Sequence, residues 1–253
     1  MTLDLQHAAQ RRMRRAVITL VAVVLVLVAA LVVIAVRGGD SGNNKPAAAP
    51  EESITAEPTP VQTLPPDEGD YVAPVKYVAL PDGTEKAGNL PVKFPHTPEG
   101  AAAMAVTSAR NAWSFDPAKI KAGILTYASA RYRDAMAASA EDGAKGNREF
   151  AGVPGTGPIP PGASLNAWPI GVKWAEVGSN TVDVLVLLRV TSVSKEGASP
   201  KTTLVVVPGR AVWESGDWKG DATDPKPLPD PVDIGSAKFN EDGWNAIQEG
   251  DRL

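Results

Sequence analysis

Residues 181–190 read TVDVLVLLRV, and this run is the clearest fold signal in the chain. Apolar side chains recur at every second position, which is the period of an extended strand with one buried face. The residues on that face are Val182, Val184, Val186, Leu188 and Val190. The run therefore predicts a long strand whose valine-rich face lies against the core of a domain.

The opposite face of this strand is also apolar in its middle, where a solvated face would be polar. Leu185 and Leu187 lie on it, and Leu204 and Val206 extend it on the next strand. Two explanations are open: the C-terminal segment folds back over the patch, or another protein subunit covers it. The first would use the apolar residues Val232, Ile234, Phe239, Trp244 and Ile247. The second makes Leu185, Leu187, Leu204 and Val206 the expected partner-binding residues.

Strands of the same period flank this run on both sides. In the preceding strand, Trp168, Ile170, Val172 and Trp174 alternate along one face, and residues 203–213 form the following strand. The turns between the strands are short, which only antiparallel neighbours allow. We therefore expect an antiparallel meander, and we expect its tryptophans to belong to the core.

Prolines interrupt two of these strands, at Pro169 and Pro208. Because proline cannot donate a hydrogen bond to a neighbouring strand, bulges or sheet edges are expected at both positions. A loop rich in glycine and proline, residues 152–164, separates this sheet from what precedes it. The sheet should therefore be curved.

Three helices are expected before the sheet. Residues 97–99 (Thr-Pro-Glu) have the composition of a helix start, and residues 116–117 (Asp-Pro) repeat the signal. A third, short helix is expected from about residue 129 to residue 141, ending near Gly143. Helices followed by an antiparallel sheet predict an α+β domain with the helices on one face of the sheet.

The N-terminal part of the chain has a different composition. Residues 16–36 carry no charge, and at about 1.5 Å rise per residue they are long enough to cross a bilayer as a helix. Arginines at positions 11, 12, 14 and 15 precede this run, so we expect a cytoplasmic N-terminus. A cleaved signal peptide is the rival interpretation, but its apolar region would be shorter.

A tether is expected after the membrane helix. Residues 38–70 carry seven acidic residues against one lysine and are rich in proline and alanine, so they should remain extended. The expected organisation is a basic cytoplasmic tail (1–15), a transmembrane helix (16–36), an acidic linker (37–70) and an extracytoplasmic domain (71–253). Within that domain we expect a core at about 92–220 and a Pro-rich extension at 224–253.

Composition excludes several classes of function. The 253 residues include no cysteine and two histidines, which excludes disulfides and thiolate metal sites and disfavours a multi-histidine metal centre. The net charge of −4 argues against binding of nucleic acid, whose phosphates need a basic surface. The nucleotide-binding, zinc-protease and serine-hydrolase motifs are absent from the sequence. No cofactor or metal is expected.

A few side chains could still serve acid–base chemistry. They are His96, Asp116, Asp134, Asp183, Tyr127 and Tyr132. For three of them a structural role is favoured over a catalytic one. His96 is expected to pack beside Phe94, Asp116 to cap a helix, and Asp183 to point away from the valine face. No catalytic residue is therefore predicted.

Two stretches carry a resemblance to known proteins. The end of the sheet, residues 213–218 (WESGDW), together with the order of helices and strands, resembles the nuclear transport factor-2-like, or cystatin-like, fold. With the membrane helix and tether, the chain resembles assembly proteins of type IV secretion and conjugation channels, including actinobacterial ones. Residues 94–102 (FPHTPEGAA) are similar to the opening of extracytoplasmic domains of such elements. The fold hosts enzymes, binding modules and scaffolds alike.

The resemblance implies a non-catalytic, single-pass protein of the plasma membrane whose outer domain binds other proteins of a conjugative transfer or secretion apparatus. Its expected partners are the lipid bilayer, through residues 16–36, and those proteins; homo-oligomers are left open. An extracytoplasmic ligand-binding or ketosteroid-isomerase-like enzyme is one alternative, and a cell-wall binding module is another. A ligand-sized cavity lined by Tyr127 or Tyr132 would favour the enzyme.

Overall fold

The computed structural model describes residues 71–222 and 227–248. The expected cytoplasmic tail, transmembrane helix and linker lie outside these residues, as do residues 223–226 and 249–253. No helix in the described ranges is both long and apolar enough to cross a membrane.

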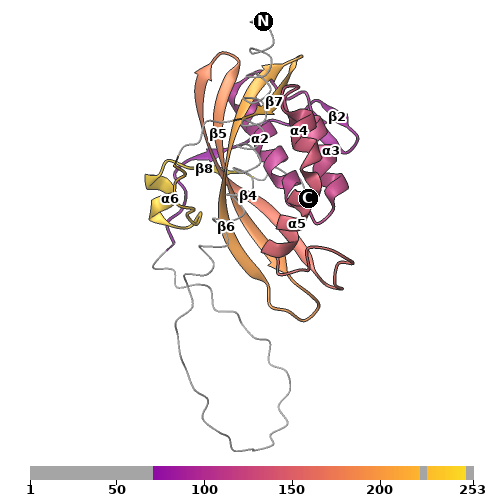
Figure 1. The fold of residues 1–253 in the computed structure, drawn as a ribbon. Coiled ribbons are helices and arrows are strands. Elements are labelled where there is room, and N and C mark those ends of the chain that lie inside the picture. The colour runs from indigo at the N-terminus through magenta and orange to yellow at the C-terminus, as the bar shows by residue number, and fades with distance from the viewer. Residues whose placement is uncertain (1–70, 223–226, 249–253) are drawn as a thin grey trace, which may run out of the picture.

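The described chain forms a mixed α+β domain around one large sheet. The helices are α2 (Pro98–Ala112), α3 (Pro117–Tyr127), α4 (Arg133–Ala138), α5 (Ala140–Phe150) and α6 (Ala237–Glu241). The long strands are β4 (Ser164–Gly178), β5 (Thr181–Val193) and β6 (Lys201–Glu214), and the short ones are β1 (Tyr77–Val78), β7 (Asp217–Asp221) and β8 (Asn245–Ile247). A separate hairpin contains β2 (Glu85–Ala87) and β3 (Leu90–Val92). Figure 1 shows α2 to α5 on one face of the sheet and α6 on the other.

The sheet contains the expected meander. Among the described residues its strand order is β1-β8-β4-β5-β6-β7, and β4 to β7 are antiparallel neighbours. Two-residue turns join β4 to β5 and β6 to β7, and the second turn has positive φ at Ser215 and Gly216. This is the backbone that the favoured hairpin turns require. The addition of β8 and β1 to the β4 side was not predicted.

Both predicted helix starts are confirmed. The Thr97 hydroxyl accepts a hydrogen bond from Gly100 N at the start of α2, and the Asp116 carboxylate accepts one from Ala118 N at the start of α3. Each cap satisfies a backbone N–H that has no partner within the helix.

The prediction of one short third helix is wrong. The structure has two helices, α4 and α5, and α5 continues through Gly143 and Gly146. A glycine inside a helix costs only about 1 kcal/mol relative to alanine, so it does not have to end one. Burial of Ala140 and Ala144 against Ile120 of α3 stabilises the continuation.

The two prolines behave differently. At Pro169 the register between β4 and β5 shifts before Gly171, so the expected bulge is confirmed. At Pro208 the pairing of β6 with β5 is unbroken, so no bulge is present there. Pro208 lies beyond the last residue pair between β6 and β7, where β6 is an edge of the sheet and tolerates proline.

The bulge divides the face predicted for β4. Val172 and Trp174 pack on the helix side of the sheet, whereas Ile170 packs on the opposite side. Trp168 belongs to neither core and is 45% exposed. The expectation that it is a core residue is therefore corrected: the inserted residue reverses the alternation along the strand.

Two separate cores result, one on each face of the sheet. The helix-side core packs α2 and Tyr127 of α3 against β4, β5 and β6, and it includes every residue of the predicted valine face of β5. The second core lies between the sheet and the C-terminal segment, residues 227–248, around Phe239 and Trp244. The sheet therefore has few exposed apolar side chains on either face.

Candidate functional site

The face expected to bind a partner is covered by the chain itself. Leu187 is fully buried and Val206 is 6% exposed, and both belong to the core around Phe239 and Trp244. Leu185 and Leu204 pack against the same core and are half-buried. Of the two explanations left open, the structure displays the first, in which the C-terminal segment folds back. The four residues are therefore not an open surface in the described chain, and their assignment to a partner stays an untested prediction.

Polar contacts fix the C-terminal segment to the sheet. The Ser236 hydroxyl caps α6 by accepting from Phe239 N, Lys173 Nζ donates to the Asp242 carbonyl, and Arg189 forms an ion pair with Asp233 at 2.8 Å. The Phe239 ring lies above Gly171, where a Cβ atom would approach it to 3.0 Å. The absence of a side chain at Gly171 therefore lets the ring sit against the sheet.

Residues 71–78, which we call the strap, bind the C-terminal segment through backbone hydrogen bonds. The backbone of the strap bonds to the segment at three places: Val72 N donates to Gly235 O, Ala246 N donates to Lys76 O, and Gln248 N donates to Val78 O. Asn240 adds two more bonds through its side-chain amide, to Ala73 O and from Val75 N. β1 and β8 consequently run parallel, joining the first and last described parts of the chain.

His96 and Tyr127 are engaged in structural contacts. The His96 ring stacks on Trp213, with centroids 4.0 Å apart, and not on Phe94 as expected. Tyr127 is 2% exposed and donates its hydroxyl to Pro91 O at 2.9 Å, which holds β3 against α3. Burial, and to a lesser degree the charge of Asp217, raises the pKa of the Tyr127 hydroxyl well above its usual value. Tyr127 is therefore a neutral donor at physiological pH.

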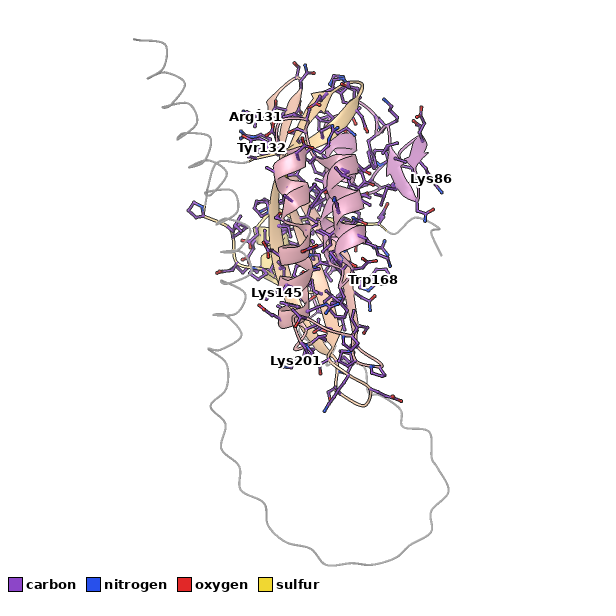
Figure 2. The ribbon with its side chains drawn as sticks, turned by 45° about the vertical axis from the view of Figure 1, so that its right-hand side comes forward. Lys86, Arg131, Tyr132, Lys145, Trp168 and Lys201 are labelled. Atoms are coloured by element: carbon purple, nitrogen blue, oxygen red, sulfur yellow. The ribbon has the colours of Figure 1, made fainter. Side chains whose placement is uncertain are left out.

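The predicted carboxylates are dispersed. Asp116 is the cap of α3, Asp134 is exposed in the first turn of α4, and Asp183 binds the Arg210 guanidinium with both oxygens, at 2.6 and 3.1 Å. Tyr132 is half-buried and lies below the Arg131 guanidinium, as labelled in Figure 2. The structure brings none of the predicted candidates together as an acid–base pair. Within the described residues it also contains no cluster of potential metal ligands.

Asp217 is a buried carboxylate that sequence reasoning missed. It is 3% exposed and accepts hydrogen bonds from Phe94 N, from Trp218 N and from Lys219 Nζ. These contacts join the turn after β6 to the residues that lead into α2. The carboxylate is fully engaged by donors, so its role is structural. A turn sequence such as Ser215-Gly216-Asp217 gives no sign that its carboxylate will be buried.

A hollow of about 550 Å³ opens between the C-terminal end of α2, the start of α3 and the start of β4. Its apolar lining comes from Leu90, Trp113, Phe115, Ile159 and Leu165. Its polar lining comes from Thr107, Arg110, Asn111, Ser114, Asp116 and Lys119. The volume lies within the range of sites that hold a small ligand or a few side chains.

The charge of the hollow is positive. Arg110 and Lys119 are exposed, and neither forms an ion pair with another described residue. The carboxylate of Asp116 is directed to the backbone as a helix cap. The Arg110 guanidinium also lies 5.0 Å from the centre of the exposed Trp168 ring. An aromatic and aliphatic floor with two cations suits an anionic group attached to an apolar one.

The sequence did contain a signal for this hollow. Trp113 and Phe115 occupy a short turn between two helices, where polar residues are usual, and Arg110 and Lys119 stand on either side of it. Aromatic residues in a turn need neighbours to cover them, and here the loop before β4 and the hairpin supply that cover only in part.

The chain matches no protein-family model, and no curated protein or solved structure is detectably similar to it.

Proposed function

We propose that this protein is a non-catalytic interaction module, held at the plasma membrane by residues 16–36, in a conjugative transfer or secretion apparatus. In this proposal the domain has a nuclear transport factor-2-like arrangement, which the order of helices before an antiparallel sheet supports. The proposed contact site is the hollow at the end of α2. It is not the sheet face around Leu187 and Val206, which the C-terminal segment covers.

The composition of the hollow is the observation that carries this proposal. Its floor is aromatic and aliphatic, and its rim carries the exposed cations Arg110 and Lys119. A partner segment with an apolar side chain next to carboxylates would fit this lining. Its apolar side chain would be buried on Trp113 and Phe115, and its carboxylates would lie beside the two cations. We therefore propose an acidic, partly apolar peptide segment as the bound element.

The anchor would make a weak contact sufficient. Confinement of the domain and its partners to one membrane surface raises their effective concentration, so that several weak contacts act together. A shallow, open hollow is consistent with a contact of this kind. The proposal needs no high affinity at any single site.

The residues that the enzyme alternative would need are engaged elsewhere. Tyr127 is bonded to the Pro91 carbonyl, and the carboxylates of Asp116 and Asp183 are held by a helix start and by Arg210. Buried Met104 and Trp218 fill the space between helices and sheet in which that enzyme would place its substrate. These contacts support an interaction module over a catalytic domain.

Charge reversal in the hollow tests the proposal. We expect Arg110→Glu with Lys119→Glu, made in the full-length protein in its own cells, to lower transfer or secretion by about tenfold or more. Both side chains are exposed, so the amount of protein in the membrane should not change. Transfer frequency and membrane abundance are the two measurements.

The matched control reverses two exposed charges outside the hollow. Lys86→Glu with Lys121→Glu changes the net charge by the same amount, and Figure 2 shows Lys86 on the hairpin that stands away from the sheet. This variant should transfer normally. Equal activity of the two double variants would show that the hollow is not the contact site.

One observation favours a second candidate function, binding to the cell wall. Trp168 exposes 45% of its surface on β4, and exposed indole rings are suited to stacking on sugars. If this function holds, Trp168→Ala should release the full-length, detergent-solubilised protein from sedimented cell-wall material. Retention that does not depend on Trp168 would exclude this ring as the contact.

A further inference from the structure

The N-terminal half of β6 is an uncovered edge of the large sheet. β7 pairs only with residues Arg210 to Glu214, whereas β5 pairs with β6 from Lys201 to Val212. Within residues 71–222 and 227–248, no strand pairs with the outer side of residues 201–209. By contrast, the outer side of β7 is met by the chain between α3 and α4, where Ser129 N donates to Gly220 O. Figure 1 shows this part of β6 along the lower margin of the sheet, past the end of β7.

The backbone groups at this edge can be assigned to the two sides of the strand. Trp213 N donates to Asn180 O, on the β5 side, and backbone direction alternates along a strand. The pairing of β5 with β6 is unbroken, so the odd-numbered residues of β6 point toward β5. Thr202, Leu204 and Val206 therefore direct their N–H and C=O groups outward, and Pro208 directs a C=O group there.

The edge has weak protection against pairing. Natural edges carry charges, prolines or bulges that prevent another strand from adding to them. Here the charge of Lys201 stands at one end and Pro208 at the other, with the run TTLVVV between them. This run has no charge and is mostly β-branched, which favours extended pairing. The middle of the edge is therefore free to accept a strand.

We infer that a second copy of this chain pairs with this edge, β6 against β6 in antiparallel order. Antiparallel self-pairing places Leu204 opposite Leu204 of the other copy and Thr202 opposite Val206. This register offers six backbone hydrogen bonds and leaves Pro200 and Pro208 outside the paired residues. It also keeps the two Lys201 side chains at opposite ends, so no like charges face each other.

Self-complementarity is the reason for choosing a second copy over another partner. A two-fold axis requires one surface patch to match itself, and an uncharged strand edge with its donors and acceptors in alternation does so. Leu204 is half-buried at the margin of the second core, so pairing would complete its burial. The two sheets would join into one continuous sheet. This inference goes beyond the proposed function, since it concerns contacts between copies.

The natural absence of cysteine makes a direct test available. Leu204→Cys, in the full-length protein in membranes, should form a disulfide-linked dimer on mild oxidation, because opposed residues in this geometry have Cα atoms about 5.5 Å apart. Ala118→Cys, on the exposed side of α3, is the control and should remain monomeric under the same oxidation. An equal yield of dimer from the two variants would overturn the inference.

A second measurement does not depend on cross-linking. Thr202→Pro removes one outward N–H and an exposed hydroxyl contact to Thr191, and leaves the bonds to β5 in place. In detergent solution, by light scattering, it should raise the concentration at half-dimerisation by about tenfold or more. Ser199→Pro, in the exposed loop before β6, should leave dimerisation unchanged. A monomer at all concentrations, or a dimer insensitive to Thr202→Pro, would refute the inference and assign the edge to a segment of the same chain or to another protein.

Discussion

The two faces of the large sheet are covered in different ways. The helix side is covered by α2 to α5, which precede the long strands in the chain, and its core includes Tyr127, Met104 and Trp218. The other side is covered by a short C-terminal segment, whose single helix, α6, has five residues. The first cover rests on long elements with their own internal hydrogen bonds. The second rests on a few large side chains and on the strap, residues 71–78.

This difference indicates a hierarchy of stability within one domain. Short elements with few buried partners open at lower free energy than long ones packed over a sheet. The C-terminal segment should therefore open without loss of the helix-side core, and the reverse should not occur. The two cores meet at β5, which supplies Leu187 to one and the adjacent Leu188 to the other.

The largest effects are expected at the two buried tryptophans. Trp218→Ala and Trp244→Ala should each lower the free energy of unfolding by about 3–5 kcal/mol. Trp218 should have the larger effect, because its indole N–H donates to Pro95 O at 2.8 Å, whereas that of Trp244 has no partner in the described residues. Chemical denaturation followed by circular dichroism measures both.

Hydrogen exchange then separates the two tryptophan variants. Trp244→Ala should accelerate amide exchange first in α6 and β8, while amides of α2 stay protected. Trp218→Ala should accelerate exchange throughout. Loss of all protection together in both variants would mean that the two faces form one cooperative unit.

Leu187 and Leu188 give a matched pair of smaller effects. Both are fully buried on β5, but Leu187 faces the C-terminal segment and Leu188 faces the helices. Each change to alanine should destabilise the domain by about 2–5 kcal/mol, with less for Leu187 because the segment over it can relax into the space. Thermal unfolding of the two variants checks the order. A larger loss for Leu187→Ala would contradict the hierarchy.

Tyr127 makes the helix side sensitive to high pH. Its raised pKa means that the folded state holds the hydroxyl proton at pH values where the unfolded chain, with a pKa of about 10, releases it. The contribution of Tyr127 to the free energy of unfolding is therefore fully present below about pH 10. It falls as the pH rises further, by up to about 1.4 kcal/mol per pH unit. Tyr127→Phe should remove that part of the decline and cost about 1 kcal/mol at neutral pH through the lost bond to Pro91.

The measurement for Tyr127 is the unfolding free energy of both proteins between pH 8 and pH 11. All other ionisable groups are common to the two proteins, so the difference between the two curves isolates Tyr127. Parallel curves would show that the hydroxyl ionises in the folded state as readily as in the unfolded chain.

The smallest effect is expected at the ion pair between Arg189 and Asp233. Its partners are 38% and 58% exposed, so Asp233→Asn should change the free energy of unfolding by less than about 1 kcal/mol. It should still accelerate exchange of the amides in α6, because the pair holds the segment to β5. An effect that is insensitive to salt would show that the contact is not electrostatic.

Local patterns in the sequence predicted much of the helix side. The caps at Thr97 and Asp116, the valine face of β5 and the bulge at Pro169 all depend on residues close together in the chain, and all are confirmed. The direction of Trp168 was missed because a single inserted residue reverses the alternation beyond it.

The second face could be predicted only as one of two alternatives. The pairing of β1 with β8 joins Tyr77 to Ala246, and no local pattern specifies a partner so far along the chain. The hollow was missed for a related reason: it forms where a helix turn, a hairpin residue and the loop before β4 meet. The aromatic turn at Trp113 and Phe115 is a local signal for such a site, but no local pattern specifies which distant segments complete its walls.

The parallel pairing of β1 with β8 has a mechanical consequence. A load applied to the chain before residue 71 would reach the backbone bonds of the strap at Val72, Lys76 and Val78 before it reached the long strands. Tension could thus peel away the outermost pair of strands and leave the helix side intact. The domain would then unfold in two steps under load, and the strands that join the strap to the C-terminal segment would separate first.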